Sequence, residues 1–370
     1  MHIKRYFILS LIIVFRAFFA NAQQIISPTT IVYTYDEAGN RVVAVTSPGY
    51  LEAEPTASVP LPGQRMDSVV ANNRINLYDM NRKNYAIGVD VGGSHLCSAV
   101  IDLDKKQLCS APVLTPMDSS GPADEILSCF KKNLLGTMEV FGRKVNRIGL
   151  AFPGPFDYEK GIPYMDQKFQ KLYGMDMPKE LRAQLDSPKT SFKFINDASA
   201  FALGECFCGS GRDRKRVIAL TLGTGVGSGF VADGVLDEHS DRVPPSGEVW
   251  NLPFEDTIVD ASFSTRWVVG RYKELTGKDV PGAKEVAQAV GTDPEARQLF
   301  CEYGERLAAF ITPWLKKFGA DTLVLGGNIS RNFPHFSGTL LAGIPEGVEV
   351  RTSTLLDQAA MIGAASLFKD

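Results

Sequence analysis

From residue 84 onward, hydrophobic positions follow two patterns: continuous apolar runs, and apolar residues at helical spacing. The continuous runs predict strands at 84–91, 95–102, 107–113, 147–152, 191–195 and 321–325. The helical spacing predicts helices at 123–139, 258–276, 283–290 and 294–318. This mixture of strands and helices predicts an α/β fold.

The clearest pattern is a pair of apolar runs joined by a glycine-rich turn, Gly92-Gly93-Ser94, with Asp90 at the end of the first run. Glycine has no Cβ, so such a turn can lie close to a ligand, and its backbone N–H groups can bind an anion. Asp90 would face a phosphate-bound cation, because Mg²⁺ prefers carboxylates and phosphate oxygens. An ordinary surface hairpin with a solvated Asp90 is the alternative.

The same pattern occurs a second time. Residues 218–233 repeat the order strand, glycine-rich turn and strand, with the turn Gly223-Thr224-Gly225. Thr221 stands where Asp90 stood, 131 residues later (221 − 90). Self-similarity at this offset predicts a duplicated unit, with two halves that hold one phosphate donor between them.

Three further segments carry candidate chemistry. The strand at 191–195 runs into Asn196 and Asp197 and then an Ala-rich helix, a junction that suits either a general base or a helix cap. The strand at 147–152 ends in a loop that contains Pro153 and Gly154, where ligands often bind in α/β sheets. The strand at 321–325 leads to Gly326 and Gly327, whose backbone could approach a flat ring or a ribose.

Composition and charge limit the function classes. With 370 residues, 44% hydrophobic and 22% charged, the chain can form a soluble globular protein of two lobes. Its net charge of −3 gives no electrostatic reason to expect nucleic acid. The six cysteines show no framework of spacings, which favours reduced thiols and a reducing compartment.

Taken in order, the motifs over 84–370 resemble the ROK family, which contains repressors and bacterial sugar kinases. Residues 196–205 are similar to the family signature Asn-Asp-Ala-Asn-Ala-Ala-Ala-Leu-Gly-Glu, and Glu248 lies in a segment similar to its Gly-Glu-(Ile/Val)-Gly-His element. The resemblance implies an actin-like (ribonuclease H-like) two-lobed fold of duplicated βββαβα-type domains, with lobes at 84–196 and 197–370. The last helix could pack back on the first lobe.

The resemblance also implies a hexose kinase, with glucose O6 as the acceptor and Asp197 as the general base. Asn196, Glu248, Pro153 and Gly154 would then contact the sugar. The donor, ATP with Mg²⁺ at Asp90, would be held by Gly92, Gly93 and Ser94, by Gly223, Thr224 and Gly225, and by Gly326 and Gly327. Polyphosphate as the donor, or a non-catalytic sugar-sensing regulator, are the alternatives, and a homodimer is left open.

The sequence departs from the family pattern after Glu248. Trp250 and Asn251 replace the Gly-His pair, which leaves the exact sugar open. The family's second sugar-binding glutamate has three candidates that the sequence does not separate: Glu255, Asp256 and Asp260. The family's cysteine run is missing from this stretch, so we expect no zinc.

The first 83 residues differ from the rest of the chain. Residues 1–23 resemble a secretory signal, because basic residues precede a short apolar run and a small-residue site. Residues 24–83 have the composition of a linker, and we expect a poorly ordered extension. A signal would export the chain, whereas ATP and sugar phosphates are cytosolic. Either the leader is real and the identity of the phosphoryl donor stays open, or translation starts at Met80 or Met66. We expect a cytoplasmic protein whose core has no membrane partner.

Overall fold

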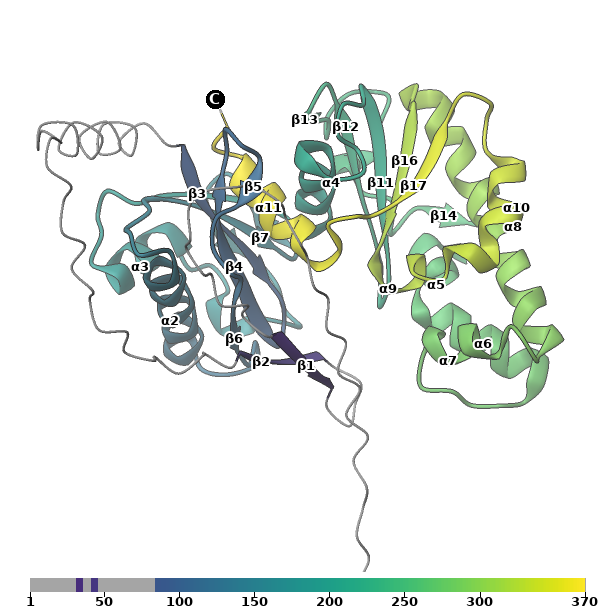
Figure 1. Ribbon diagram of the computed structural model, residues 1–370, viewed down its shortest axis with the longest axis horizontal. Helices are drawn as coiled ribbons and strands as arrows, with labels where there is room; N and C mark the ends of the chain where they lie inside the picture. The colour runs from purple at the N-terminus through teal and green to yellow at the C-terminus, as the bar shows by residue number, and fades with distance from the viewer. Residues whose placement is uncertain (1–30, 36–40, 46–83, 370) are drawn as a thin grey trace, which may run out of the picture. The chain divides into compact units, whose positions relative to one another are not determined.

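The computed structural model describes residues 31–35, 41–45 and 84–369. The chain divides into two compact units, Met1–Arg65 and Met66–Asp370. The predicted signal-like segment and both suggested internal starts lie outside the described residues, and the predicted domain limits stay predictions. In the first unit, β1 (Ile31–Tyr35) and β2 (Arg41–Val45) form an antiparallel pair (Figure 1).

The second unit contains two mixed sheets, and the first has the strand order β10-β7-β3-β4-β5. Strand β3 lies parallel to β7 and antiparallel to β4, which also pairs with β6. The strands are β3 (Tyr85–Val91), β4 (His95–Asp102), β5 (Gln107–Leu108), β6 (Val113–Pro116), β7 (Arg147–Phe152) and β10 (Ser191–Asn196). The apolar runs that predicted these strands are buried, which is the main stabilising term of a core.

The second sheet has the strand order β13-β12-β11-β16-β17. Its strands are β11 (Arg216–Leu222), β12 (Val226–Ala232), β13 (Val235–Leu236), β16 (Thr322–Gly326) and β17 (Glu349–Thr352). Counted from β10 and from β17, the two sheets have the same succession of parallel and antiparallel neighbours. The predicted duplication is therefore present in the fold.

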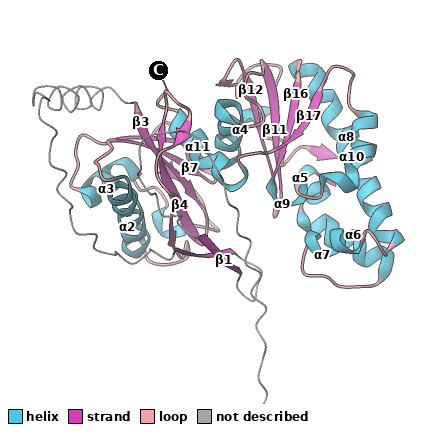
Figure 2. Cartoon of the chain, viewed as in Figure 1, coloured by secondary structure: helices cyan, strands magenta, loops and turns pink. Residues whose placement is uncertain are grey.

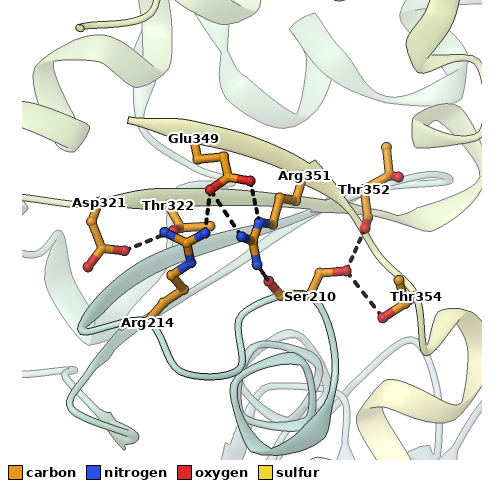
Figure 3. Close-up of polar contacts among 8 residues, drawn as sticks. All are labelled: Ser210, Arg214, Asp321, Thr322, Glu349, Arg351, Thr352 and Thr354. Atoms are coloured by element: carbon orange, nitrogen blue, oxygen red, sulfur yellow. Dashed lines mark hydrogen bonds and ion pairs between the residues drawn. The ribbon is translucent and has the colours of Figure 1, made fainter. Parts of the chain in front are cut away.

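Polar side chains hold the outer edge of the second sheet, as Figure 3 shows. Glu349 on β17 pairs with Arg214 and Arg351. Arg351 Nη1 donates to the Ser210 carbonyl at 2.8 Å, and Ser210 Oγ donates to the Thr352 carbonyl at 2.7 Å. These contacts fasten the loop after α4 (Asp197–Cys208) to β17.

Helices cover the sheets and supply the rest of the two main cores (Figure 2). The core of the first sheet includes residues from α2 (Ala123–Phe141) and α3 (Met177–Leu185), and the 3₁₀ turn η1 (Gln170–Leu172) contributes Leu172 to it. The core of the second sheet takes residues from α5 (Val259–Phe263), α6 (Thr265–Thr276), α7 (Ala283–Ala289), α8 (Pro294–Phe318) and α10 (Phe333–Gly343). The remaining elements are β8 (Phe156–Asp157), β9 (Ile162–Pro163), η2 (Pro245–Gly247), β14 (Pro253–Phe254), β15 (Thr257–Ile258) and α9 (Gly327–Ser330).

Helix α8 shows how local sequence sets the limits of an element. The Asp293 side chain accepts hydrogen bonds from the N–H groups of Glu295 and Ala296, which otherwise have no partner in the first turn. Pro294 occupies the first helical position, where its missing N–H does no harm. Gly319 ends the helix with φ 69°, a left-handed conformation that favours glycine.

Helices α4 and α11 (Ala359–Ser366) have no large polar face, and both pack against strands of the two sheets. The 3₁₀ turn η3 (Leu356–Gln358) precedes α11. They cross at close range, because a Cβ on Gly363 would lie 1.8 Å from the Ala200 carbonyl oxygen. Helix α11 also packs on β3, where a Cβ on Gly88 would lie 1.8 Å from the Met361 carbonyl oxygen. The last helix is thus in contact with the first sheet.

Two predicted elements are wrong in their limits. The strand predicted at 107–113 is divided into β5 and β6, and Pro112 between them has no N–H to donate to a neighbouring strand. The helix predicted at 258–276 is divided into α5 and α6 at Ser264, whose backbone is extended. The break allows Asp260 and Thr265 to reach the second glycine turn, described below. None of the described helices combines the length and apolar composition needed to cross a bilayer.

Candidate active site

The site is centred on the junction between β10 and α4. The Asn196 carboxamide oxygen accepts hydrogen bonds from the N–H groups of Ala198 at 2.9 Å and Ser199 at 3.2 Å, so Asn196 is the helix cap. Asp197 is the first residue of the helix, and its Oδ1 also accepts from the Ala198 N–H at 2.9 Å. Since Asn196 provides the cap, the carboxylate of Asp197 is not needed for it.

A cavity of about 680 Å³ opens on one side of Asp197. On the side of the first sheet it is lined by the loop after β7, a segment near residue 167, and the β10–α4 junction. On the side of the second sheet it is lined by β12 and the segment after η2. The predicted sugar residues Pro153, Gly154, Asn196, Asp197 and Glu248 all line it. We call this space the sugar-side cavity.

A second cavity of about 240 Å³ opens on the other side of Asp197. Its polar lining is mostly acidic, with the carboxylates of Asp90, Asp197 and Asp357 and the guanidinium of Arg331. Gly327 and Thr221 complete the part contributed by the second sheet. We call this space the donor-side cavity; Asp197 lines both cavities.

Burial changes the acidity of these carboxyl groups. Burial raises the pKa of Asp197 above its usual range, while the Ala198 N–H and the charge of Lys168 act in the opposite direction. Burial, with the neighbouring charges of Asp197 and Asp357, raises the pKa of Asp90 to about 7. Acids that hold protons near neutral pH are typical of functional sites.

The donor-side cavity fits a divalent cation held together with phosphate oxygens. Asp90 is half-buried beside two other carboxylates, and a cation between them would relieve the repulsion that raises its pKa. Carboxylate oxygens are the ligands that Mg²⁺ prefers. Among the described residues no three His, Cys, Asp or Glu side chains gather closely enough to hold a metal alone, so phosphate oxygens would have to complete the ligand set.

Comparisons with known proteins agree with this arrangement. Residues 86–238 match the family model described as the ROK family. The chain contains a ROK family domain. It is 27% identical over 314 residues to a glucokinase from Thermotoga maritima, a match that covers 77% of this chain and 97% of that protein. It is 26% identical over 318 residues to an N-acetyl-D-glucosamine kinase from Haemophilus influenzae, covering 76% and 98%.

The solved structure of a ROK family glucokinase from Streptomyces griseus, in complex with glucose and AMPPNP, superposes with a TM-score of 0.61. Its sequence is 20% identical, over 76% of this chain and 98% of that chain, so the likeness concerns the fold. The predicted family and the predicted actin-like α/β fold are confirmed. The relatives' names agree with the predicted enzyme class, a phosphotransferase with an alcohol acceptor.

The two glycine turns of the ROK domain lie outside the lining of both cavities. Gly92, Gly93 and Ser94 connect β3 to β4, and the Gly92 N–H donates to the His95 carbonyl at 3.0 Å. Gly223, Thr224 and Gly225 connect β11 to β12, and the Gly223 carbonyl accepts from the N–H and Oγ1 of Thr265. Their contact with donor phosphates stays a prediction.

The three candidates for a second sugar carboxylate lie beyond the segment that matches the family model. Asp260 Oδ1 accepts from the Val226 N–H at 2.9 Å and Oδ2 pairs with Arg266, so Asp260 holds the second glycine turn. Glu255 pairs with Arg306, and Asp256 is exposed in a turn. None of the three lines the sugar-side cavity.

The position of the family glycine is taken by Trp250, whose Nε1 donates to Glu248 Oε2 at 2.9 Å, and Asn251 follows in place of the histidine. Glu248 and Trp250 both line the sugar-side cavity. Val249 between them is fully buried, and its N–H donates to Ser228 Oγ at 3.1 Å. The buried Val249 therefore fixes the backbone that presents Glu248 and Trp250 to the cavity.

Of the glycine pair after β16, only Gly327 lines the donor-side cavity. Its φ of +80° is left-handed, and a Cβ there would lie 2.4 Å from the Leu222 carbonyl oxygen, so glycine is required. Gly326 is buried, and a Cβ would lie 2.2 Å from the Phe201 ring. Glycine at this position makes room for the Phe201 ring, and the contact of Gly326 with the nucleotide stays a prediction.

Three residues at or beside the site were not singled out by the sequence: Arg331 and Asp357 line the donor-side cavity, and Tyr158 contacts Asn196 from outside the lining of both cavities. Tyr158 accepts from Asn196 Nδ2 at 3.3 Å and donates to the Phe152 carbonyl at 3.0 Å, so it orients the Asn196 amide. Arg331 Nη2 and Asp357 Oδ1 form an ion pair of 3.6 Å in the lining of the donor-side cavity. Arg331, four residues after Gly327, and Tyr158, four residues after Gly154, each stand near enough to a motif to have been suspected.

Proposed function

We propose that this protein is a sugar kinase that transfers the terminal phosphoryl group of ATP to a hexose hydroxyl, with Asp197 as the general base. The observation that carries the proposal is the position of Asp197, which lines both the sugar-side and the donor-side cavity. An acceptor in one cavity and a phosphate donor in the other would meet at this carboxylate. A base at the meeting point is what in-line phosphoryl transfer requires.

The reaction proceeds in one displacement. The hexose hydroxyl gives its proton to the Asp197 carboxylate as its oxygen attacks the terminal phosphorus. The new O–P bond forms while the bond from that phosphorus to the bridging oxygen breaks, and the electron pair leaves with the nucleoside diphosphate. Most of the rate would come from positioning and from stabilising charge, since the transfer is largely dissociative.

Asp90 would hold Mg²⁺ together with the donor phosphates, and the ion supplies charge neutralisation for the leaving group. Gly327 and Arg331 would contact the donor from the second sheet, because both line the donor-side cavity. The glycine turns at residues 92–94 and 223–225 would add backbone N–H groups from either side.

The acceptor would be a hexose of the glucose type, held by Asn196, Glu248 and the loop at Pro153 and Gly154. The names of the relatives, glucokinase and N-acetyl-D-glucosamine kinase, support an acceptor of this class. We propose glucose and transfer to O6. The Trp250 side chain beside Glu248, at the position of the family glycine, would shape this pocket.

The acidic lining of the donor-side cavity favours an Mg²⁺-nucleotide over polyphosphate. Polyphosphate is a long anion that would need several cations, whereas Arg331 is the one basic residue in this lining. The retained acids Asp90 and Asp197 also favour an enzyme over a sugar-sensing regulator. A cytoplasmic location belongs to this proposal, because ATP is available there.

The test is a coupled assay of the purified chain with ATP and with polyphosphate, across glucose, mannose and N-acetylglucosamine. We expect glucose and ATP to give the highest kcat/KM and omission of Mg²⁺ to abolish turnover. Activity with polyphosphate but not ATP would overturn the donor. Sugar binding without any phosphoryl transfer would favour the regulator.

A further inference from the structure

Lys168 brings a positive charge to the sugar-side cavity, next to Asp197. It lines the cavity together with Asp197, and its charge acts on that carboxylate. The Lys168 side chain is exposed, and no hydrogen bond or ion pair holds its ammonium group among the described residues. A cation of this kind is available to an anionic ligand.

The backbone of Lys168 is held to the first glycine turn by a chain of hydrogen bonds. The Ser119 N–H donates to the Gly93 carbonyl at 3.0 Å, and the Phe169 N–H donates to the Ser119 carbonyl at 3.0 Å. Phe169 has a left-handed backbone with φ 53°, and its side chain is fully buried, 5.1 Å from the Phe152 ring between centroids. Lys168 is therefore anchored by its neighbour and does not lie on a loose loop.

The stem of Lys168 passes over the glycine turn. A Cβ on Gly93 would lie 3.6 Å from Lys168 Cδ and 3.7 Å from Cε, which is ordinary van der Waals contact. The stem thus covers Gly93, and the same side chain lines the sugar-side cavity together with Asp197. Lys168 therefore adjoins both the turn proposed to hold donor phosphates and the cavity proposed to hold the acceptor.

We propose that Lys168 binds the phosphoryl group in transit and stabilises its equatorial oxygens in the transition state. The inference rests on the proposed function, since it assigns a further catalytic residue to the same reaction. Lys168 exchanges no proton in this step; the hydroxyl proton goes to Asp197. Charge placed where it develops in the transition state is a large term in phosphoryl transfer.

The experiment compares Lys168→Met with Lys168→Arg and with Lys171→Met. Lys171 is an exposed lysine three residues away on η1, so it is a matched control for the loss of one charge. Phosphoryl transfer is measured with glucose and Mg²⁺-ATP, and glucose binding is followed separately by the fluorescence of Trp250. We expect Lys168→Met to lower kcat about 100-fold, with glucose affinity within threefold of wild type.

A second readout does not depend on turnover. With glucose present, wild type should bind Mg²⁺-ADP with aluminium fluoride more tightly than Mg²⁺-ADP alone, because the fluoride complex mimics the phosphoryl group in transit. Lys168→Met should lose most of this gain, while Lys168→Arg and Lys171→Met keep it. A Lys168→Met enzyme with kcat within threefold of wild type, or with the full gain, would overturn the role of Lys168. A wild-type chain that phosphorylates no hexose would overturn the proposed function itself, and the role of Lys168 with it.

Discussion

At the scale of single residues, the roles of Asn196 and Asp197 are separated by geometry. Asn196 satisfies the first N–H groups of α4, and its Nδ2 donates to Tyr158. The adjacent Asp197 is left at the boundary between two cavities. Two adjacent residues thus have different positions: Asn196 caps the helix, and Asp197 faces both cavities.

Asp197→Asn should lower kcat by about 10²–10⁴-fold, because the amide cannot accept the hydroxyl proton. The volume of the side chain is nearly unchanged, so glucose binding measured by Trp250 fluorescence should stay within threefold. Glu159 is an exposed acid that lines neither cavity, so Glu159→Gln serves as the control and should keep full activity. More than a tenth of wild-type kcat in Asp197→Asn would contradict the assignment of the base.

The pH dependence should respond to Lys168. Burial raises the pKa of Asp197 above its usual range, and the nearby Lys168 charge opposes the rise. The base works when ionised, so kcat/KM falls as pH falls through this pKa. Lys168→Met removes a charge that favours the carboxylate, and the acid limb of the pH–rate profile should move to higher pH. Lys168→Arg should leave the limb in place, and a limb that moves to lower pH in Lys168→Met would contradict the electrostatic contact.

At the scale of elements, α4 and α11 set the position of the site. Helix α4 begins with Asp197, and α11 follows directly after Asp357 through η3. The two helices meet at Gly204 and Gly363, where no side chain would fit between the backbones. Their close packing therefore decides how far the two carboxylates lie from each other.

Gly363→Ala and Gly338→Ala should have effects of opposite sign. A Cβ on Gly363 would overlap the Ala200 carbonyl oxygen at 1.8 Å, so α4 and α11 must separate, at a cost of about 1–3 kcal/mol. Gly338 lies inside α10 with nothing within 4 Å, so alanine there should raise stability by about 0.5–1 kcal/mol. Urea unfolding measures both, and a stabilised Gly363→Ala would show that the helices do not cross this closely.

Glu205 at the end of α4 fastens two loops from inside the protein. Its fully buried carboxylate accepts from the Ser210 N–H at 2.7 Å, from Ser353 Oγ and from the Leu355 N–H at 3.2 Å. Glu205→Ala leaves these donors without partners and should lower the free energy of unfolding by about 2–5 kcal/mol. Glu139→Ala on the exposed face of α2 should change it by less than about 0.5 kcal/mol. Equal stability of the two variants would contradict this assignment.

At the scale of the whole molecule, all the proposed site residues belong to one compact unit, Met66–Asp370. The second unit also contains both sheets and the ROK family segment. The activity should therefore not require the first unit.

A chain that begins at Met66 should fold cooperatively and keep kcat within about threefold of the full chain, because every lining residue of both cavities is retained. The comparison uses the coupled glucose assay and thermal unfolding of both proteins. A shortened chain that folds but has lost activity would assign the first 65 residues a part in the reaction.

Much of this architecture could be predicted from local sequence. Continuous apolar runs indicated β3 and β7, and apolar residues at helical spacing indicated α2 and α8, close to their observed limits. A strand buried on both faces requires the first pattern, and a helix buried on one face requires the second. The two glycine hairpins predicted the duplication, since each occurs at the same place in its sheet. The Asn196-Asp197 signature brought the correct residues to the cavity wall.

The tertiary structure decided what local sequence cannot encode, namely which distant side chains share a space. Asp260 resembles a sugar ligand by its place in the chain, yet its carboxylate is used to hold a turn 34 residues away. Lys168 and Asp357 carry no motif, and they reach the site only because Phe169 is buried in one core and α11 packs between the sheets. The sequence by itself determined the main elements, their duplication and the carboxylate proposed as the base, because these follow from periodicity and short motifs. The packing of segments far apart in the chain determined the surroundings of that carboxylate, because electrostatics acts through distance in space and not through order along the chain.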